Sequence, residues 1–294
     1  MASETVCNGN STETKYHNGK AVDENDALGN TRFPTAQFTA PMATDRNEHY
    51  YRMTHEKRGV AVILNHEHFS AQGMKLRTGT KVDCENLAAE LKRLHFDVEV
   101  YHDLEYTKVI SQIGNLAKRD HSKNDCFIMV VLSHGERDVI YAKDHFYKVE
   151  TLWNAFTADK VPSLAGKPKL FFIQACQGDQ LDPGVTLQRT ETDGVACSYR
   201  IPAHADFLIA YSTIPGFYSW RNTTRGSWFI QSLCEELRHN GFNADILTLL
   251  TFVNRRVALD YESNTPDIPQ MHAQKQIPCV TSMLTRLVQF TKRE

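Results

Sequence analysis

The sequence predicts an α/β fold in which a mainly parallel central sheet is covered by helices on both faces. Short, almost uniformly apolar runs alternate with segments whose apolar residues recur at helical spacing, and this alternation is typical of three-layer α/β/α domains. Two of the apolar runs lead into reactive side chains, one into His134 and the other into Cys176. Because parallel strands present their carboxyl ends at one edge of a sheet, we expect a functional site at that edge.

The first expected elements are a strand at 59–64 and the helix that follows it. Thr80 and Asp83 fit a capping box at the start of this helix, and leucines recur at helical spacing from Leu87 onward. The later elements are expected, in order, as a strand at 96–101, a helix at 105–119, a strand at 126–132, a hairpin at 139–149, a strand at 170–173, a strand at 205–212, helices at 224–239 and 243–260, and a final strand at 279–290.

The bulk properties exclude several classes of protein. With 33 basic and 35 acidic side chains the formal net charge is -2, so no general attraction to nucleic acid or to an acidic membrane is expected. No apolar stretch reaches the ~18 residues that span a bilayer, and the polar N-terminus lacks the core of a signal peptide. The 7 cysteines are scattered without a Cys-x-x-Cys pair. We therefore expect a cytoplasmic protein with no metal, cofactor, nucleic-acid or membrane partner.

Two polar segments interrupt this pattern. Residues 1–45 are rich in Asn, Thr, Ser, Gly and Glu without an apolar period, which indicates a disordered leader. The stretch 179–200 is rich in Gly, Pro, Thr, Asp and Gln, and it predicts an exposed connector at which proteolysis is expected.

Cys176 and His134 together favour acyl transfer through a thioester. A thiol needs a base or a lowered pKa to attack at neutral pH, and His134 could serve as that base and then protonate the leaving amine. The amides of Gly135 and Cys176 could form an oxyanion hole, worth roughly 3 kcal/mol per donor in the transition state.

The alternative interpretation is that these cysteines are ordinary small apolar residues. It is the better one for the cysteines that lie inside apolar patterns, namely Cys84, Cys126, Cys234 and Cys279. Cys176 differs because it ends its strand, yet its position alone leaves both interpretations open.

Several motifs resemble those of one family. The run Gln174-Ala175-Cys176-Gln177-Gly178 matches the known signature of the caspases, which also have a histidine about 50 residues upstream. The resemblance continues, in unbroken order over about residues 50–292, in the segments 75–80, 133–136, 217–222 and 275–279. The chain is most similar to the effector caspases of insects. The resemblance implies a caspase-like three-layer sandwich whose sheet continues across a two-fold dimer.

Caspases cleave after aspartate, and the resemblance implies which residues receive this P1 side chain. The corresponding residues are Arg77, Gln174 and Arg221. Guanidinium groups suit a carboxylate because they donate two hydrogen bonds in a fixed fork. Two facing arginines would repel each other without an anion, and a neutral P1 residue would leave them unpaired. Without this motif context, each arginine would be interpreted as a solvated surface charge.

The resemblance also implies that an extended substrate adds as a strand along the segment 218–221. Its backbone would pair with Ser219 and Arg221, its P2 residue would contact Tyr218 and Trp220, and P4 would lie near Asn222 and Trp228. Core packing is the alternative for Tyr218 and Trp220, since alternation does not say which face is buried. The segment 264–269 carries two prolines and few aromatic residues, so the P4 preference stays open.

Caspase zymogens are activated by cleavage after aspartate in such connectors. Asp193 ends an acidic tetrapeptide in the connector and resembles these sites, Asp26 in the leader is a second candidate, and Asp182 is a weaker third. Cleavage at the first two would divide the chain into a prodomain (1–26), a large subunit (27–193) and a small subunit (194–294), with 179–200 as the intersubunit linker.

The leader is too short and too polar for a helical adaptor-binding domain, which favours an effector activated by an upstream initiator caspase. The apolar last strand would leave an open edge that a second copy could cover, so we expect a homodimer. Inhibitor-of-apoptosis proteins are further expected partners.

Two alternatives remain for the function. A related peptidase that cuts after Arg or Lys would need acidic residues in place of Arg77 and Arg221. A catalytically inactive homologue that acts as a regulatory binding partner would typically lack the cysteine or the histidine.

Overall fold

The structure is a computed structural model that describes residues 40–71, 73–184 and 203–293. The leader, most of the connector and the predicted cleavage sites Asp26 and Asp193 lie outside the described residues. Within the described part, no helix is long and apolar enough to cross a membrane.

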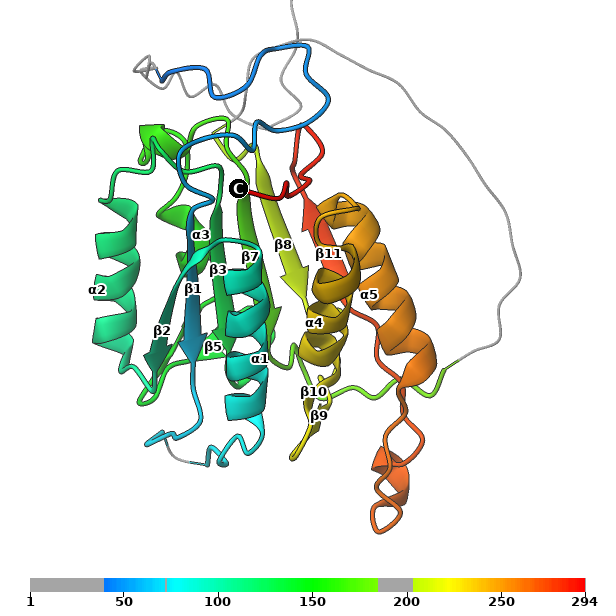
Figure 1. Cartoon of the computed structure of the whole chain (residues 1–294). Helices are drawn as coiled ribbons and strands as arrows, with labels where there is room; N and C mark the ends of the chain where they lie inside the picture. Colours follow the sequence, from blue (N-terminus) through cyan, green and yellow to red (C-terminus); the bar gives the residue numbers. More distant parts are fainter. Residues whose placement is uncertain (1–39, 72, 185–202, 294) are drawn as a thin grey trace, which may run out of the picture. The chain divides into compact units, whose positions relative to one another are not determined.

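A six-stranded sheet forms the centre of the fold (Figure 1). Its strand order is β11-β8-β7-β3-β1-β2, and all neighbours are parallel except β11, which runs antiparallel to β8. The strands are β1 (Val60–Asn65), β2 (Asp97–His102), β3 (Phe127–Leu132), β7 (Lys169–Gln174), β8 (Phe207–Tyr211) and β11 (Cys279–Ser282). The mainly parallel sheet that the alternating pattern predicts is confirmed.

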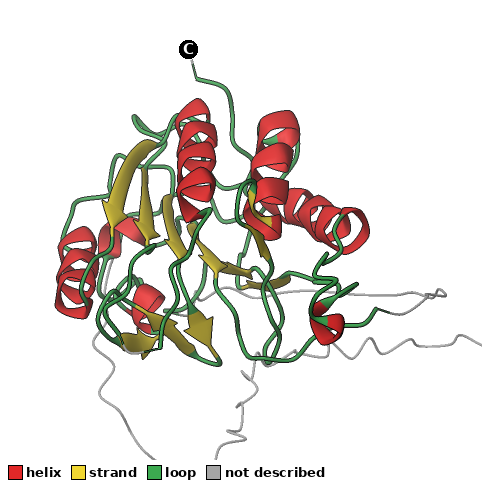
Figure 2. Ribbon diagram, turned by 90° about the horizontal axis from the view of Figure 1, so that it is seen from below, coloured by secondary structure: helices red, strands yellow, loops and turns green. Residues whose placement is uncertain are grey.

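Helices cover both faces of this sheet, as Figures 1 and 2 show. One face carries α1 (Thr80–Arg93), α4 (Trp228–Asn240) and α5 (Ile246–Asp260), and the other carries α2 (Tyr106–Ala117) and the short α3 (Thr151–Asn154). Each face has its own apolar core. The fold is therefore a three-layer α/β/α sandwich.

The central position of β3 in the sheet explains why its sequence is an unbroken apolar run. All six of its residues are buried, and alternate side chains enter opposite cores. Ile128 and Val130 pack with α1, α4 and α5, whereas Met129 and Val131 pack with α2 and α3. Because both faces of such a strand are buried, the polar half of the usual alternation is missing.

Two small sheets and two short helices connect the main elements. The predicted hairpin is confirmed as β5 (Val139–Tyr141) and β6 (Phe146–Lys148), and β4 (Gly135–Glu136) pairs with β5. A second hairpin consists of β9 (Arg221–Asn222) and β10 (Gly226–Ser227). Two 3-10 helices, η1 (Pro162–Leu164) and η2 (Pro269–Met271), complete the elements of the described part.

The capping box predicted for the first helix is wrong. Gly79 is the N-cap of α1 and makes no side-chain cap. Thr80 donates its hydroxyl to Asn65 Oδ1 at 2.6 Å instead, and Asp83 bonds to Ser227 far along the chain. Tertiary partners have replaced the local ones.

The starts of α4 and α5 also differ from prediction. Helix α4 begins at Trp228 because the residues before it form the β9–β10 hairpin. Helix α5 begins at Ile246, where the carboxylate of Asp245 accepts hydrogen bonds from the backbone of Leu247 and Thr248.

The final strand is much shorter than the predicted 279–290 and ends at Ser282. The apolar residues after it belong to this chain's own core, where Val288 and Phe290 are buried and the Phe290 ring packs edge-on against Phe96. The edge of the sheet beyond β8 is therefore only the four residues of β11, while β2 forms the opposite edge.

Candidate active site

The register of the sheet brings His134 and Cys176 to the same edge. Strands β3 and β7 pair in parallel up to Leu132 and Gln174, and the backbone N–H of Ser133 donates to the carbonyl of Gln174 at 3.1 Å. His134 and Cys176 each lie two positions beyond that last pair. Gly135 packs so closely that a Cβ placed on it would lie 2.8 Å from the carbonyl oxygen of Cys176. A side chain at position 135 would therefore fill the space between the two strand ends.

The thiol of Cys176 is half-buried and faces the backbone of Ser219. Its sulfur lies 3.4 Å from the Ser219 amide nitrogen and 3.8 Å from the Ser219 carbonyl oxygen. Burial raises the pKa of Cys176 above its ordinary value, although the Ser219 N–H and the positive charges of Arg77 and Arg221 act in the opposite direction. In the substrate-free chain this cysteine is therefore mainly a thiol at neutral pH.

His134 is held as a neutral base. Its Nε2 lies 2.7 Å from the carbonyl oxygen of Lys75, and its ring packs against Phe69 with centroids 4.9 Å apart. A carbonyl can only accept, so Nε2 carries the proton and Nδ1 keeps the lone pair. Burial and the charges of Arg77 and Arg221 lower the pKa of His134 to about 4. The hydrogen bond to Lys75 acts in the opposite direction.

Arg77 is a buried guanidinium group close to Arg221. Its Nη1 donates to the carbonyl of His66 at 3.1 Å and to the hydroxyl of Thr80 at 2.8 Å. Its Nε and Nη2 are buried and have no hydrogen-bond partner in the described part of the chain. Burial and the nearby charge of Arg221 lower the pKa of Arg77 to about 9, so it is still charged at neutral pH.

Arg221 and Gln174 are two further polar residues of this region. Arg221 lies in β9, and its Nε donates to the carbonyl of Thr78 at 2.9 Å. Gln174 ends β7 and donates to the hydroxyl of Ser219 at 2.7 Å, which in turn donates to Ser212 at 2.8 Å. Side chains from the segment before α1, from β7 and from the hairpin thus converge beside Cys176.

An aromatic stack lies beside Arg221. Trp220 stacks on Trp228 with centroids 5.7 Å apart, and Trp228 stacks on Tyr261 at 5.4 Å. Trp228 is almost fully buried, whereas Tyr218 is 36% exposed. Trp220 is half-buried and packs against the same core as Trp228, so core packing, the alternative for Tyr218 and Trp220, describes Trp220 in part and does not describe Tyr218.

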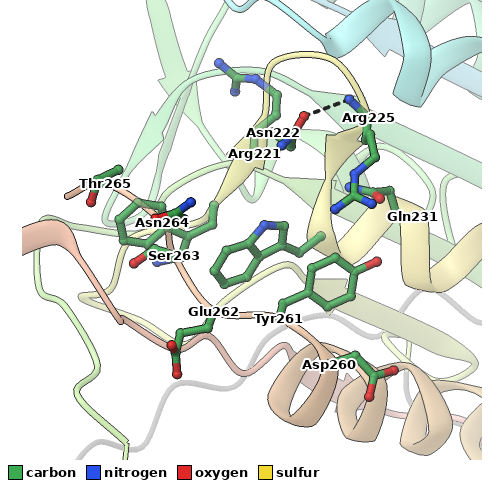
Figure 3. A pocket seen from close by; sticks show the side chains of 12 residues that line it. Arg221, Asn222, Arg225, Gln231, Asp260, Tyr261, Glu262, Ser263, Asn264 and Thr265 are labelled. Carbon is green, nitrogen blue, oxygen red and sulfur yellow. Dashed lines mark hydrogen bonds between the residues drawn. The ribbon is translucent and has the colours of Figure 1, made fainter. Parts of the chain in front are cut away.

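Trp220, Arg221 and Trp228 line a cavity of about 410 Å³, to which the segment 260–265 also contributes. Figure 3 shows Gln231 and Arg225 on one side of it and Asn264 and Thr265 on the other. Asn222 also borders the cavity, but its Oδ1 accepts from the backbone N–H groups of Thr224 and Arg225 and so serves the hairpin turn.

The caspase domain family matches residues 58–289 of this sequence. The chain belongs to the caspase family. It is 58% identical to Caspase-1 of Spodoptera frugiperda over 98% of this chain and 97% of that protein, and 61% identical to caspase drICE of Drosophila melanogaster over 87% and 76%. It is 43% identical to Caspase-3 of Bos taurus over 83% and 88%.

The crystal structure of Caspase-1 from Spodoptera frugiperda superposes on this caspase with a TM-score of 0.83 at 59% identity, covering 87% of this chain and 99% of that one. These relatives group the caspase with the effector caspases. It is a cysteine-type endopeptidase that acts on proteins, and no observation favours a catalytically inactive homologue.

Only part of the segment 218–221 of this caspase is a strand. Arg221 pairs within the hairpin, Ser219 is buried, and the backbone N–H of Trp220 is taken by the side chain of Gln276 at 2.6 Å. The segment 218–221, along which a substrate is expected to add, is therefore not one continuous strand in this structure.

Sequence analysis missed two residues of this region. Tyr261 follows α5 directly, and its aromatic side chain just before the loop 264–269 was a signal that could have been used. Asp83 was assigned to a cap, and nothing local in the sequence indicates its true partner.

Proposed function

We propose that this caspase hydrolyses peptide bonds after aspartate, with Cys176 as nucleophile and His134 as base and acid. One observation carries the proposal. Arg77 is 1% exposed and holds two nitrogen donors without a partner in the described residues, close enough to Arg221 for the two charges to interact. Such a pair gains most from an anion placed between them. A short P1 carboxylate, assisted by Gln174, supplies that anion.

The residues divide the reaction as follows. His134 Nδ1 accepts the thiol proton, and the sulfur attacks the carbonyl carbon that follows the P1 side chain. The N–H groups of Gly135 and Cys176 stabilise the oxyanion, and His134 returns the proton to the leaving amine. A water molecule, deprotonated by His134, then hydrolyses the thioester and frees the sulfur.

Substrate binding also releases the thiol. The Cys176 sulfur now contacts the Ser219 backbone, and the substrate backbone pairs with Ser219 and Arg221. Substrate therefore takes over the Ser219 contact and leaves the sulfur facing the scissile carbonyl. Tyr218 and Trp220 contact P2, while Asn222 and Trp228 lie towards P4.

The maturation scheme follows from the same resemblance. An initiator caspase cleaves after Asp193 and then Asp26, which yields the subunits 27–193 and 194–294 and removes the prodomain 1–26. Asp182, although in the linker 179–200, is a poor site because its carbonyl oxygen accepts from the backbone N–H of Lys275 at 2.8 Å. A protease could not pair with a segment that is already paired.

Assembly and location complete the proposal. The open edge strand β11 pairs with its copy in a two-fold dimer. The mature enzyme works in the cytoplasm during apoptosis, where inhibitor-of-apoptosis proteins restrain it.

Three fluorogenic tetrapeptides that differ only at P1 test the specificity. We expect the processed protein to cleave the Asp peptide and to discriminate against its neutral isostere Asn by about 10⁴-fold or more, because Asn leaves the guanidinium groups unpaired. Preference for a Lys peptide would show the related basic-specific peptidase. Cleavage of none of the three would show an inactive homologue.

A further inference from the structure

The carboxylate of Asp83 lies where two parts of the proposed pocket meet. Asp83 is 1% exposed in the first turn of α1. Its Oδ1 accepts the backbone N–H of Ser227 at 2.8 Å, and its Oδ2 accepts the Ser227 hydroxyl at 2.6 Å. Ser227 is the N-cap of α4, yet it makes no side-chain cap to its own helix. Its hydroxyl serves Asp83 instead of the helix end.

The backbone around this contact leaves no spare room. Gly226 has φ +93, and a Cβ there would lie 2.2 Å from Asp83 Oδ1. Gly79 has φ +91, and a Cβ there would lie 2.8 Å from the carbonyl oxygen of Asn222. Both positions need glycine because a side chain would push the segment 77–83 away from the β9–β10 hairpin. Figure 1 shows this hairpin below α4, with α1 alongside.

Asp83 is also coupled to the pocket by charge. Burial raises the pKa of Asp83 to about 6, while the bonds from Ser227 and the charges of Arg77 and Arg221 lower it. In return, the Asp83 carboxylate raises the pKa of both guanidinium groups. The other titratable groups that it faces are the thiols of Cys84 on α1 and Cys234 on α4, whose pKa values rise with burial and with its charge.

We propose that Asp83 is a positioning residue for substrate recognition: by holding Ser227 with an ionised carboxylate, it fixes the hairpin that carries Arg221 opposite Arg77. Asp83 does not touch the substrate. The inference rests on the proposed function, because it assumes that the two arginines receive the P1 carboxylate. Asp83 belongs to the proposed large subunit and Ser227 to the small one, so the contact joins the two halves of the pocket after the chain is cut.

The test compares Asp83→Asn with a matched control on the same helix. Glu90 is a second buried acid of α1, and it too is bonded to α4, through Arg238 at 2.7 Å. Processed enzymes carrying Asp83→Asn, Glu90→Gln or Ser227→Ala are assayed with a P1-Asp tetrapeptide between pH 5 and pH 8. KM, kcat and the pH profile of kcat/KM are measured.

For Asp83→Asn we expect KM to rise about tenfold or more with kcat changed less than about threefold. Wild-type kcat/KM should fall as acidification through about pH 6 protonates Asp83, and Asp83→Asn should lose this acidic fall of kcat/KM. Ser227→Ala should raise KM less and keep the acidic fall, because the carboxylate remains. Glu90→Gln should leave both KM and the acidic fall as in wild type.

A wild-type KM and pH profile in folded Asp83→Asn would overturn the positioning role. If that variant does not fold, Ser227→Ala decides, and an unchanged KM there overturns the role. The proposed function is tested separately by Arg221→Ala. Intact cleavage of the P1-Asp peptide by that variant would overturn the assignment of the pocket, and the inference with it. Loss of cleavage in Arg221→Ala together with an unchanged KM and pH profile in Asp83→Asn would overturn only the positioning role.

Discussion

The backbone N–H of Ser219 points at the sulfur of Cys176 from 3.4 Å. The proposed nucleophile is thus in contact with the segment to which the substrate is proposed to bind. His134 is meanwhile a neutral base bonded to Lys75. Without substrate, the proton therefore stays on sulfur, and this arrangement has a consequence for reactivity.

Alkylation of Cys176 in the substrate-free, uncleaved chain should depend on pH as that of a buried thiol does. Because burial raises its pKa above the ordinary 9.0, we expect the rate with iodoacetamide to be slow at pH 7 and to climb through and beyond pH 9. Mass spectrometry of the Cys176 peptide gives the rate, and Cys279→Ala removes the other half-buried thiol of the described residues. A plateau already reached at neutral pH would show a preformed thiolate–imidazolium pair.

Cys176→Ala should abolish both peptide hydrolysis and self-cleavage after Asp193. The reason is that no other group in the described site is placed to form the thioester. Fragment masses of the expressed chain report self-cleavage, with Cys279→Ala as the control that still processes itself. Residual fragments ending at Asp193 in Cys176→Ala, from a preparation free of other proteases, would point to a second nucleophile.

Arg221→Ala should lower kcat/KM for the Asp peptide by about 10²-fold, which corresponds to about 3 kcal/mol for a charge-assisted contact. Arg221→Lys keeps the charge but not the planar fork, so we expect only partial recovery. Among the described residues the Arg221 side chain makes one hydrogen bond, from Nε to the carbonyl of Thr78, so the chain should still fold without it. Unchanged activity, measured beside thermal unfolding, would place Arg221 outside the pocket.

Tyr261→Ala should weaken the binding of substrates that reach the cavity beside Trp228. Removing the ring that stacks on Trp228 at 5.4 Å costs roughly 1 kcal/mol of packing, so KM for tetrapeptides should rise about fivefold. A dipeptide substrate that ends at P2 serves as the control and should be unaffected. An equal effect on both substrates would mean that Tyr261 acts on the fold and not on the cavity.

Lys169 should make stability rise with pH above neutrality. It is fully buried at the start of β7, where Nζ donates to the carbonyl of Lys167 at 2.9 Å and lies 4.8 Å from the Phe207 ring centroid. Burial lowers its pKa to about 8 from 10.5, so between these values the unfolded chain binds more protons than the folded one. The free energy of unfolding therefore gains a positive slope across this window.

Urea unfolding of Cys176→Ala, with and without Lys169→Met, isolates that slope. The stability of the lysine form relative to the methionine form should increase from pH 8 to pH 10.5. A constant difference would mean that Lys169 keeps its ordinary pKa in the folded chain.

The paths of β3 and β7 could be predicted because both strands are buried on two faces. Burial on both sides forces an apolar run, and polar residues and glycine mark its end. The same logic failed for the final strand, where 279–290 is also rich in apolar residues, although polar residues interrupt them. There the chain turns after Ser282 and buries Phe290 among its own helices, and apolarity alone cannot separate a strand from a buried coil.

The cap prediction failed for a different reason. Thr80 and Asp83 have the right spacing for a local capping box, but the partner of Asp83 is 144 residues away. Packing of the hairpin against α1 decides that contact, and nothing within one helical turn reports it.

The sequence alone predicts that a cysteine and a histidine end two parallel strands, in a chain whose motifs are those of caspases. Those features are local, since each strand and the residue that ends it are contiguous and only need to be buried. The tertiary structure decided what the side chains face: the sulfur on the Ser219 backbone, the unpartnered guanidinium of Arg77, and the carboxylate of Asp83 between two helices. These depend on segments far apart in sequence, whose approach is set by the packing of the whole core.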